Sequence, residues 1–184
     1  ILNRHGFHFT KSLGQNFLID DNILKKIVKA ADINPGDRVL EIGPGIGTLT
    51  RELAALAQKV VTVEIDQRLL PILKETLADF QNVTVIHGDI LKIDLMKLTR
   101  DLFDNLSFKV VANLPYYITT PIIMGILEQG VAFESITVLI QKEVAERIVA
   151  SPGSKDYGAL SVAVQYYAEP HLVGKVPASV FMPP

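Results

Sequence analysis

The stretch Val39-Leu40-Glu41-Ile42-Gly43-Pro44-Gly45-Ile46-Gly47-Thr48 decides the fold class. It begins with a short, mainly apolar run, which predicts a buried strand, and continues with three glycines at alternate positions. Glycines in a strand-to-helix turn let the backbone approach a ligand, and the first turn of the next helix offers free amide groups. The segment therefore predicts a ligand-binding loop at the carboxyl end of a strand.

Strands and helices alternate along the rest of the chain. This alternation predicts a mainly parallel sheet with helices on both faces and with ligands at the carboxyl ends of its strands. Residues 160–167 fit a helix or a strand equally well. The predicted strands are 39–42, 60–65, 83–86, 109–112, 136–140 and 171–176, and the predicted helices are 23–31 after a cap at Asp20 or Asp21, 49–57, 69–78, 95–103, 121–127 after a cap at Thr120, and 143–149.

Composition excludes several classes of protein. The chain has 184 residues, which is enough for one domain with its own core. Hydrophobic residues make up 48% of it, and this fraction excludes a disordered tail. A net charge of −2 excludes nucleic-acid binding by bulk charge, so the basic residues of the first 29 positions either meet phosphates locally or form a solvated helix face. Without cysteine there is no thiolate nucleophile and no sulfur-based zinc site.

Two acidic residues follow later strands at informative positions. Glu64 ends the strand after the glycine loop, 21 positions beyond Gly43, where a carboxylate suits the hydroxyls of a ribose. Asp89 follows the third strand, where it either accepts from an adenine amino group or caps a turn. Asp66 is predicted to cap the next helix. Together the loop and acids indicate an adenosine-containing ligand, without separating NAD from S-adenosylmethionine.

The turn Asn113-Leu114-Pro115-Tyr116 follows the fourth predicted strand and is typical of enzymes that methylate an exocyclic amine. The Asn113 side-chain oxygen and the Leu114 carbonyl can accept both N–H groups of an adenine amine, which directs its lone pair at a methyl group. Pro115 fixes the turn, and Tyr116 offers a face on which a base can stack. The alternative is an ordinary strand-ending turn with an incidental aromatic residue.

Three separate motifs resemble the ribosomal RNA adenine dimethyltransferases, and nearly the whole chain takes part in the resemblance. Gly14 and Leu114 favour the small-subunit (16S) branch, because the large-subunit enzymes more usually have S-Q-N-F and N-I-P-Y. The motifs are Lys11-Ser12-Leu13-Gly14-Gln15-Asn16-Phe17-Leu18, Glu41-Ile42-Gly43-Pro44-Gly45-Ile46-Gly47 and Asn113-Leu114-Pro115-Tyr116-Tyr117-Ile118-Thr119-Thr120-Pro121.

The resemblance implies a Rossmann-like class I methyltransferase fold with a seven-stranded, mostly parallel sheet. It implies an enzyme that transfers methyl groups from S-adenosylmethionine to N6 of two adjacent adenines in a single-stranded loop of 16S rRNA. The product would be N6,N6-dimethyladenosine, with a role in small-subunit biogenesis. The expected partner is small-subunit rRNA or a pre-30S particle. A cytoplasmic monomer without metal or membrane is expected.

The matched motifs also imply residue roles and domain limits. Residues 1–184 are expected to be the catalytic domain, with 1–20 as an N-terminal arm and the family's C-terminal helical domain lying outside this chain. Phe181 resembles the Phe of an F-x-P-x-P turn, which would face Tyr116 across the target base. The implied catalytic residues are Asn113, Leu114, Pro115, Tyr116 and Phe181, and the implied cofactor-binding residues are Asn16, Leu18, Gly43, Gly45, Glu64, Asp89 and Asn113.

Other functions remain open from the sequence. A large-subunit (23S) rRNA adenine methyltransferase and a mainly non-catalytic rRNA-binding assembly factor share the resemblance. A nicotinamide oxidoreductase is disfavoured, because the glycine spacing differs from G-x-G-x-x-G and Pro44 lacks an N–H. A DNA adenine methyltransferase is disfavoured because its turn is usually D-P-P-Y or N-P-P-Y, whereas Leu114 occupies the second position of the turn in this chain.

Overall fold

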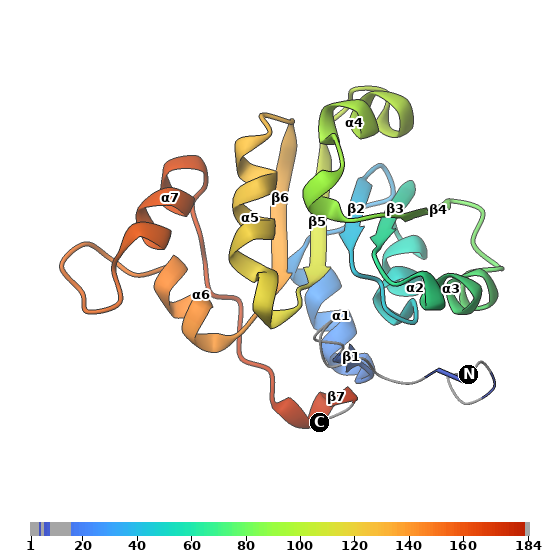
Figure 1. The fold of residues 1–184 in the computed structure, drawn as a ribbon, viewed down its shortest axis with the longest axis horizontal. Helices are drawn as coiled ribbons and strands as arrows, with labels where there is room; N and C mark the ends of the chain where they lie inside the picture. The colour runs from blue at the N-terminus through green and yellow to red at the C-terminus, as the bar shows by residue number, and fades with distance from the viewer. Residues whose placement is uncertain (1–3, 5, 8–15, 183–184) are drawn as a thin grey trace.

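Five parallel strands form the centre of the computed structural model, which describes residues 4, 6, 7 and 16–182 (Figure 1). Their order in the sheet is β4-β3-β2-β5-β6. The chain runs outward from β2 on one side and then returns to β5 on the other, so the carboxyl ends of β2 and β5 flank the switch point where such sheets bind ligands. The strands are β2 Arg38–Ile42, β3 Lys59–Glu64, β4 Val83–His87, β5 Phe108–Asn113 and β6 Phe133–Leu139.

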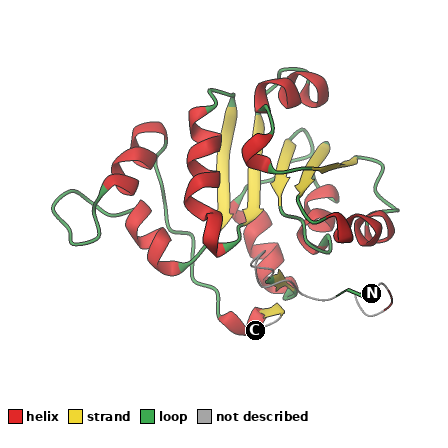
Figure 2. Ribbon diagram, viewed as in Figure 1, coloured by secondary structure: helices red, strands yellow, loops and turns green. Residues whose placement is uncertain are grey.

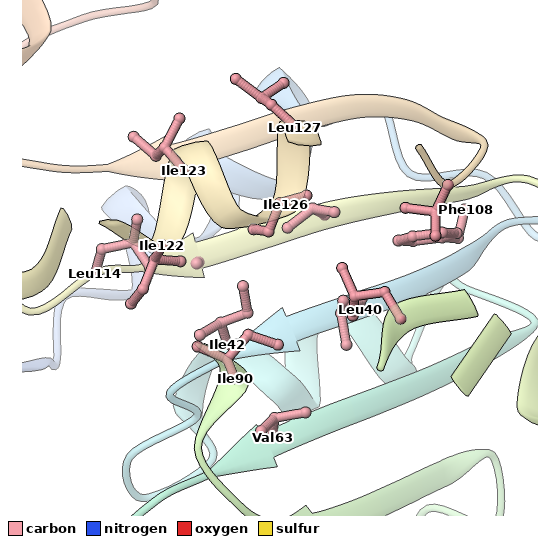
Figure 3. Close-up of a cluster of buried hydrophobic side chains, with 14 of the residues drawn as sticks. Leu40, Ile42, Val63, Ile90, Phe108, Leu114, Ile122, Ile123, Ile126 and Leu127 are labelled. Atoms are coloured by element: carbon pink, nitrogen blue, oxygen red, sulfur yellow. The ribbon is translucent and has the colours of Figure 1, made fainter. Parts of the chain in front are cut away.

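Helices cover both faces of this sheet (Figure 2). Alternate residues of a strand point to opposite faces, so each central strand contributes to two hydrophobic clusters. On one face Leu40 and Val110 pack with α4 and α5, and Figure 3 shows this cluster. On the other face Val39 and Val111 pack with α1 and α2. The helices are α1 Asp21–Ala30, α2 Thr48–Ala54, α3 Leu70–Thr76, α4 Leu95–Phe103, α5 Thr119–Glu128, α6 Lys142–Ile148 and α7 Ala159–Tyr167, with short 3₁₀ turns η3 Gln67–Leu69, η4 Ile90–Lys92, η5 Tyr116–Ile118 and η6 Ala178–Val180.

A second, two-stranded sheet lies at the carboxyl edge of the five-stranded one (Figure 1). It joins β1, Phe17–Leu18, in antiparallel pairing to β7, Phe181–Met182. The expected single sheet of seven strands is therefore corrected to five parallel strands plus a separate antiparallel pair. The physical reason is that β1 and β7 pair with each other across the end of the large sheet and not with an edge strand of that sheet.

The strand predicted over residues 171–176 is wrong. This segment has no regular secondary structure, and its apolar side chains Leu172 and Val173 are exposed. It lies across a groove from β6, whose outer edge pairs with no strand in the described part of the chain. A strand needs a partner for its backbone groups, and this segment is not close enough to β6 to be one.

The other helices and strands begin and end close to their predicted positions, with two differences. Residues 160–167, which the sequence left ambiguous, belong to the helix α7, Ala159–Tyr167. α5 begins at Thr119 and its N-cap is Ile118, so the cap predicted at Thr120 is wrong and Pro121 lies within the first turn, where no N–H is needed. Asp20 caps α1 by accepting from two backbone amides. Over the described residues, no helix is long and apolar enough to span a membrane.

Candidate functional site

A cleft opens at the carboxyl edge of the sheet, where the loops after β2, β3 and β5 meet β1. This is the place that the switch in strand order predicts for a ligand. Its lining brings together groups from four distant parts of the sequence. The lining residues are Asn16, Phe17, Leu18, Glu41, Gly43, Pro44, Gly45, Ile46, Thr48, Leu49, Glu64, Ile65, Leu69, Asn113, Leu114, Pro115, Tyr116 and Tyr117.

The glycine loop forms one wall of the cleft, and its conformation requires glycine at two of the lining positions. Gly43 and Gly45 have φ of +68° and +58°, in the left-handed region that other residues rarely adopt. At Gly45 a Cβ would lie 2.9 Å from the ring of Phe17, so β1 can rest directly on the loop. Gly43 donates its N–H to the carbonyl of Val63, which ties the loop to β3.

Glu64 ends β3 with its side chain at the cleft, although the residue is only 4% exposed. Its Oε1 accepts a hydrogen bond of 2.8 Å from the Asp66 amide. Burial raises the pKa of Glu64 to about 6, although backbone amides favour the charged form. Asp66 itself caps η3 and pairs with Arg68, as predicted for a capping residue. The cleft thus presents one carboxylate that is ionised at neutral pH.

Glu41 is a second carboxyl group in the lining and is 1% exposed. Its two oxygens, and the hydroxyls of Thr50 and Thr62, are buried and have no hydrogen-bond partner of standard geometry among the described residues. The two hydroxyls still favour its ionised form, but burial outweighs them, and the pKa of Glu41 rises to about 7. The negative charge of Glu64 contributes in the same direction. An acid that holds its proton more tightly than an exposed carboxyl group therefore lies beside the glycine loop.

The turn after β5 forms the opposite wall. Asn113 is half-buried, and its Nδ2 donates to the Asn16 carbonyl at 3.0 Å. The Leu114 side chain is buried, and its amide donates to the Leu139 carbonyl of β6. The Pro115 carbonyl accepts from the Thr119 hydroxyl at 3.0 Å, which joins the turn to α5. Tyr116 and Tyr117 are 41% and 57% exposed, so two aromatic residues of this turn are open to solvent at the cleft.

Most of the predicted site residues meet in this cleft. Asn16, Leu18, Gly43, Gly45, Glu64 and the turn 113–116 all line it. Asp89 does not line it: its side chain accepts from the Leu91 amide and caps η4. Phe181 is also outside the lining, in β7 opposite Leu18. The roles of Asp89 toward an adenine and of Phe181 toward a base stay predictions.

Nine lining residues were not predicted as site residues from the sequence, among them Phe17, Glu41 and Thr48. A charged residue within an otherwise apolar buried strand was the available signal for Glu41. Phe17 and Thr48 carry no such signal, because their contacts join residues far apart in the chain. The motif residues 11–15 lie outside the described part of the structure.

Comparison with known proteins gives a consistent result over almost the whole chain. The family described as "Ribosomal RNA adenine dimethylase" matches residues 6–184. The "Ribosomal RNA small subunit methyltransferase A" of Alkaliphilus metalliredigens is 61% identical over 183 residues, and that of Clostridioides difficile is 54% identical. The match covers 100% of this chain but 64% and 63% of those relatives, so the chain spans just under two thirds of their length.

Solved structures of a dimethyladenosine transferase and of an rRNA methyltransferase have a fold similar to that of this chain. A dimethyladenosine transferase from Plasmodium falciparum has a TM-score of 0.69 and 36% identity, over 81% of this chain and 52% of that one. The 23S rRNA methyltransferase ErmE has a TM-score of 0.65 and 36% identity, over 73% of this chain and 51% of that one.

Proposed function

This chain belongs to the ribosomal RNA adenine dimethylase family, and from that premise we propose that it methylates N6 of adenine in small-subunit rRNA. The methyl donor is S-adenosylmethionine and the product is N6,N6-dimethyladenosine. The target is two adjacent adenines in a single-stranded loop, where bases can leave the stack and enter a pocket. Residues 1–184 are the catalytic domain of the proposed enzyme, with residues 1–20 as its arm.

The observation that carries this proposal is the meeting of the Asn113 turn with the glycine loop. A Cβ on Gly43 would lie 3.9 Å from the backbone oxygen of Asn113, so the two walls are in contact at the base of the cleft. A ligand on the loop and an amine held by the turn would therefore be neighbours. Methyl transfer between two such groups depends mainly on alignment and proximity.

The residues of the cleft fit S-adenosylmethionine. When bound, this cofactor supplies a methyl group on a positively charged sulfonium, which is a good leaving group. The ionised Glu64 offers an acceptor for ribose hydroxyls at the end of β3. Glu41 also belongs to the lining of the cleft, but its carboxyl group is buried against the hydroxyls of Thr50 and Thr62. Gly43 leaves its side of the loop open to the ligand.

The proposed chemistry asks little of the chain beyond holding and orienting the amine. Oδ1 of Asn113 and the Leu114 carbonyl accept the two N–H bonds of the adenine amine, which pulls its nitrogen toward a tetrahedral shape. The exposed ring of Tyr116 stacks on the base, a contact worth about 1–3 kcal/mol in single-strand binders. No strong base is needed, because the methylated nitrogen loses its proton readily.

The choice of small-subunit over large-subunit rRNA rests on similarity. The relatives named for the small subunit are 54–61% identical to this chain, whereas the 23S enzyme ErmE is 36% identical. The expected partner is accordingly small-subunit rRNA or a pre-30S particle, and the reaction is expected in the cytoplasm. About a third of each relative's length lies outside its match to this chain, and these assignments are proposals for the whole protein.

The decisive experiment measures the product on defined RNA. The protein is incubated with S-adenosylmethionine and with small-subunit or large-subunit particles that lack adenine dimethylation, and nucleosides are quantified by mass spectrometry. We expect N6,N6-dimethyladenosine in the small-subunit sample only. Product confined to large-subunit RNA would refute the substrate, and no methylated adenine in either would refute the reaction.

Asn113→Ala is the matched variant. It removes the acceptor Oδ1 and is expected to abolish methyl transfer while cofactor binding, measured by titration calorimetry, changes little. Transfer at the unmodified protein's rate would show that the turn does not hold the amine.

A further inference from the structure

The strand β1 is held by hydrogen bonds along both of its edges. In an antiparallel pair, alternate residues direct their backbone groups to opposite edges. One edge faces β7, where the Ile19 amide donates to the Val180 carbonyl at 3.0 Å. The carbonyls of Asn16 and Leu18 belong to the other edge, and both are bonded to side chains of the five-stranded half of the molecule.

Those two side chains come from the two walls of the cleft. The Thr48 hydroxyl, at the start of α2 after the glycine loop, donates to the Leu18 carbonyl at 2.9 Å. Nδ2 of Asn113, at the end of β5, donates to the Asn16 carbonyl at 3.0 Å. β1 therefore bridges the glycine loop and the catalytic turn, and we call this pair of bonds the clasp.

The clasp determines which way the Asn113 amide faces. A backbone carbonyl can only accept a hydrogen bond, so the atom of Asn113 that meets Asn16 must be the nitrogen. Oδ1 is consequently directed away from β1 and remains free to accept. An amide free to rotate would present its donor nitrogen to the substrate amine for part of the time, and two donors repel.

The packing of its side chains also restricts the position of β1. Leu18 is 3% exposed within the cluster beneath α1 and α2. The Phe17 ring lies against Gly45, where a Cβ would come within 2.9 Å. With its side chains packed in this way, β1 is held at the edge away from β7 by the hydrogen bonds from Thr48 and Asn113.

We propose that Thr48 is a positioning residue for methyl transfer: by fixing β1 it holds the Asn16 carbonyl against Nδ2 of Asn113. The substrate amine then always meets Oδ1. This inference rests on the proposed function, in which Asn113 accepts from that amine. It predicts that a hydroxyl beside the glycine loop affects the rate of the chemical step, although it touches no reacting atom.

The test compares Thr48→Val, which loses the hydroxyl at nearly constant volume, with Thr48→Ser, which keeps it. For Thr48→Val we expect kcat at saturating cofactor to fall roughly three- to tenfold, the range for loss of one hydrogen bond, with KM for RNA within about twofold. Thr48→Ser is expected to recover most of the rate. Thr48→Ala deletes the same bond with less bulk and gives the same comparison if the valine variant does not fold.

A second readout reports the orientation directly and needs no substrate. The side-chain amide protons of Asn113, assigned by NMR from their loss in Asn113→Ala, should exchange with water faster in Thr48→Val than in Thr48→Ser. Unchanged exchange, equal rates in the two variants, or a higher cofactor Kd at unchanged kcat would overturn the proposal. If the unmodified protein methylates no RNA, the proposed function fails, whereas the exchange comparison still decides whether the clasp exists.

Discussion

Replacing Glu41 by glutamine tests the electrostatics of the buried floor of the cleft. Glutamine has nearly the same shape and mimics the neutral acid. Burial raises the pKa of Glu41 from 4.5 to about 7, so the folded protein binds this proton more tightly than the unfolded chain does. Between pH 4.5 and 7 the folded state is the more protonated one, and the free energy of unfolding therefore falls as pH rises.

The size of the effect follows from the same shift. About 2.5 pH units at 1.36 kcal/mol each correspond to about 3 kcal/mol of stability, present below pH 4.5 and absent above about pH 7. Glu41→Gln cannot ionise and escapes this loss. Its stability relative to the unmodified protein should rise by about 3 kcal/mol between pH 4.5 and pH 8, or roughly 6–12 °C in Tm for a chain of this size.

Urea unfolding of both proteins at pH 4.5, 6, 7 and 8 measures the difference. Glu64 titrates in the same window, but it is present in both proteins and cancels to a first approximation. Glu128→Gln, at an exposed position on α5, is the matched control for removing one carboxylate. Parallel stability curves for the unmodified protein and Glu41→Gln would refute the reasoning, because they would mean that burial does not hold a proton on Glu41.

Three further predictions concern other parts of the molecule. Glu64→Gln should weaken S-adenosylmethionine binding about 10- to 100-fold in calorimetry, as expected for lost charge-assisted hydrogen bonds. The affinity of the unmodified protein should decrease when the pH is lowered below about 6, because Glu64 becomes protonated. A pH-independent affinity would contradict this. Gly45→Ala should lower the unfolding free energy by about 1–2 kcal/mol, because its positive φ and the Phe17 ring leave no room for a Cβ, and a thermal melt at the unmodified Tm would disprove it. Lys109→Met should cost about 1.5–3 kcal/mol in urea unfolding, the range for a hydrogen bond to a charged group, since the half-buried Asp37 carboxylate loses its partner at 2.8 Å. Burial acts to raise the pKa of Asp37, but the hydrogen bond from Lys109 helps to keep it below its ordinary value. A smaller cost in Asp37→Asn/Lys109→Met than in Lys109→Met would support this cause, and an equal cost would argue against it.

The sequence predicted those features that depend on local pattern. Apolar spacing located the strands from 38 to 139 and the helices between them, usually within two or three residues. The glycine loop, Glu64 and Asn113 were found because each lies at the carboxyl end of a strand, and parallel strands place these ends at one edge of the sheet. Positions relative to the sheet therefore followed from the order of elements alone.

Features that depend on contacts between distant segments could not be predicted in this way. β1 and β7 are two residues each, too short for any periodicity, and exist because they pair with each other. Residues 171–176 have the composition of a strand but no partner. Thr48 gained its importance only when folding brought the Leu18 carbonyl to it. The burial of Glu41 depends on α2, which covers its face of the sheet and places Thr50 beside its carboxyl group.

The β1–β7 pair also links the order of synthesis to the completion of the site. Leu18 faces Phe181, so β1 leaves the ribosome before the five-stranded sheet but can pair only after the whole of that sheet has been synthesised. The five-stranded sheet has all its strands by Leu139 and can form earlier, whereas β1 lacks its outer partner until residues 181–182 have emerged. A nascent chain would thus acquire its scaffold well before it could hold β1 firmly over the glycine turn.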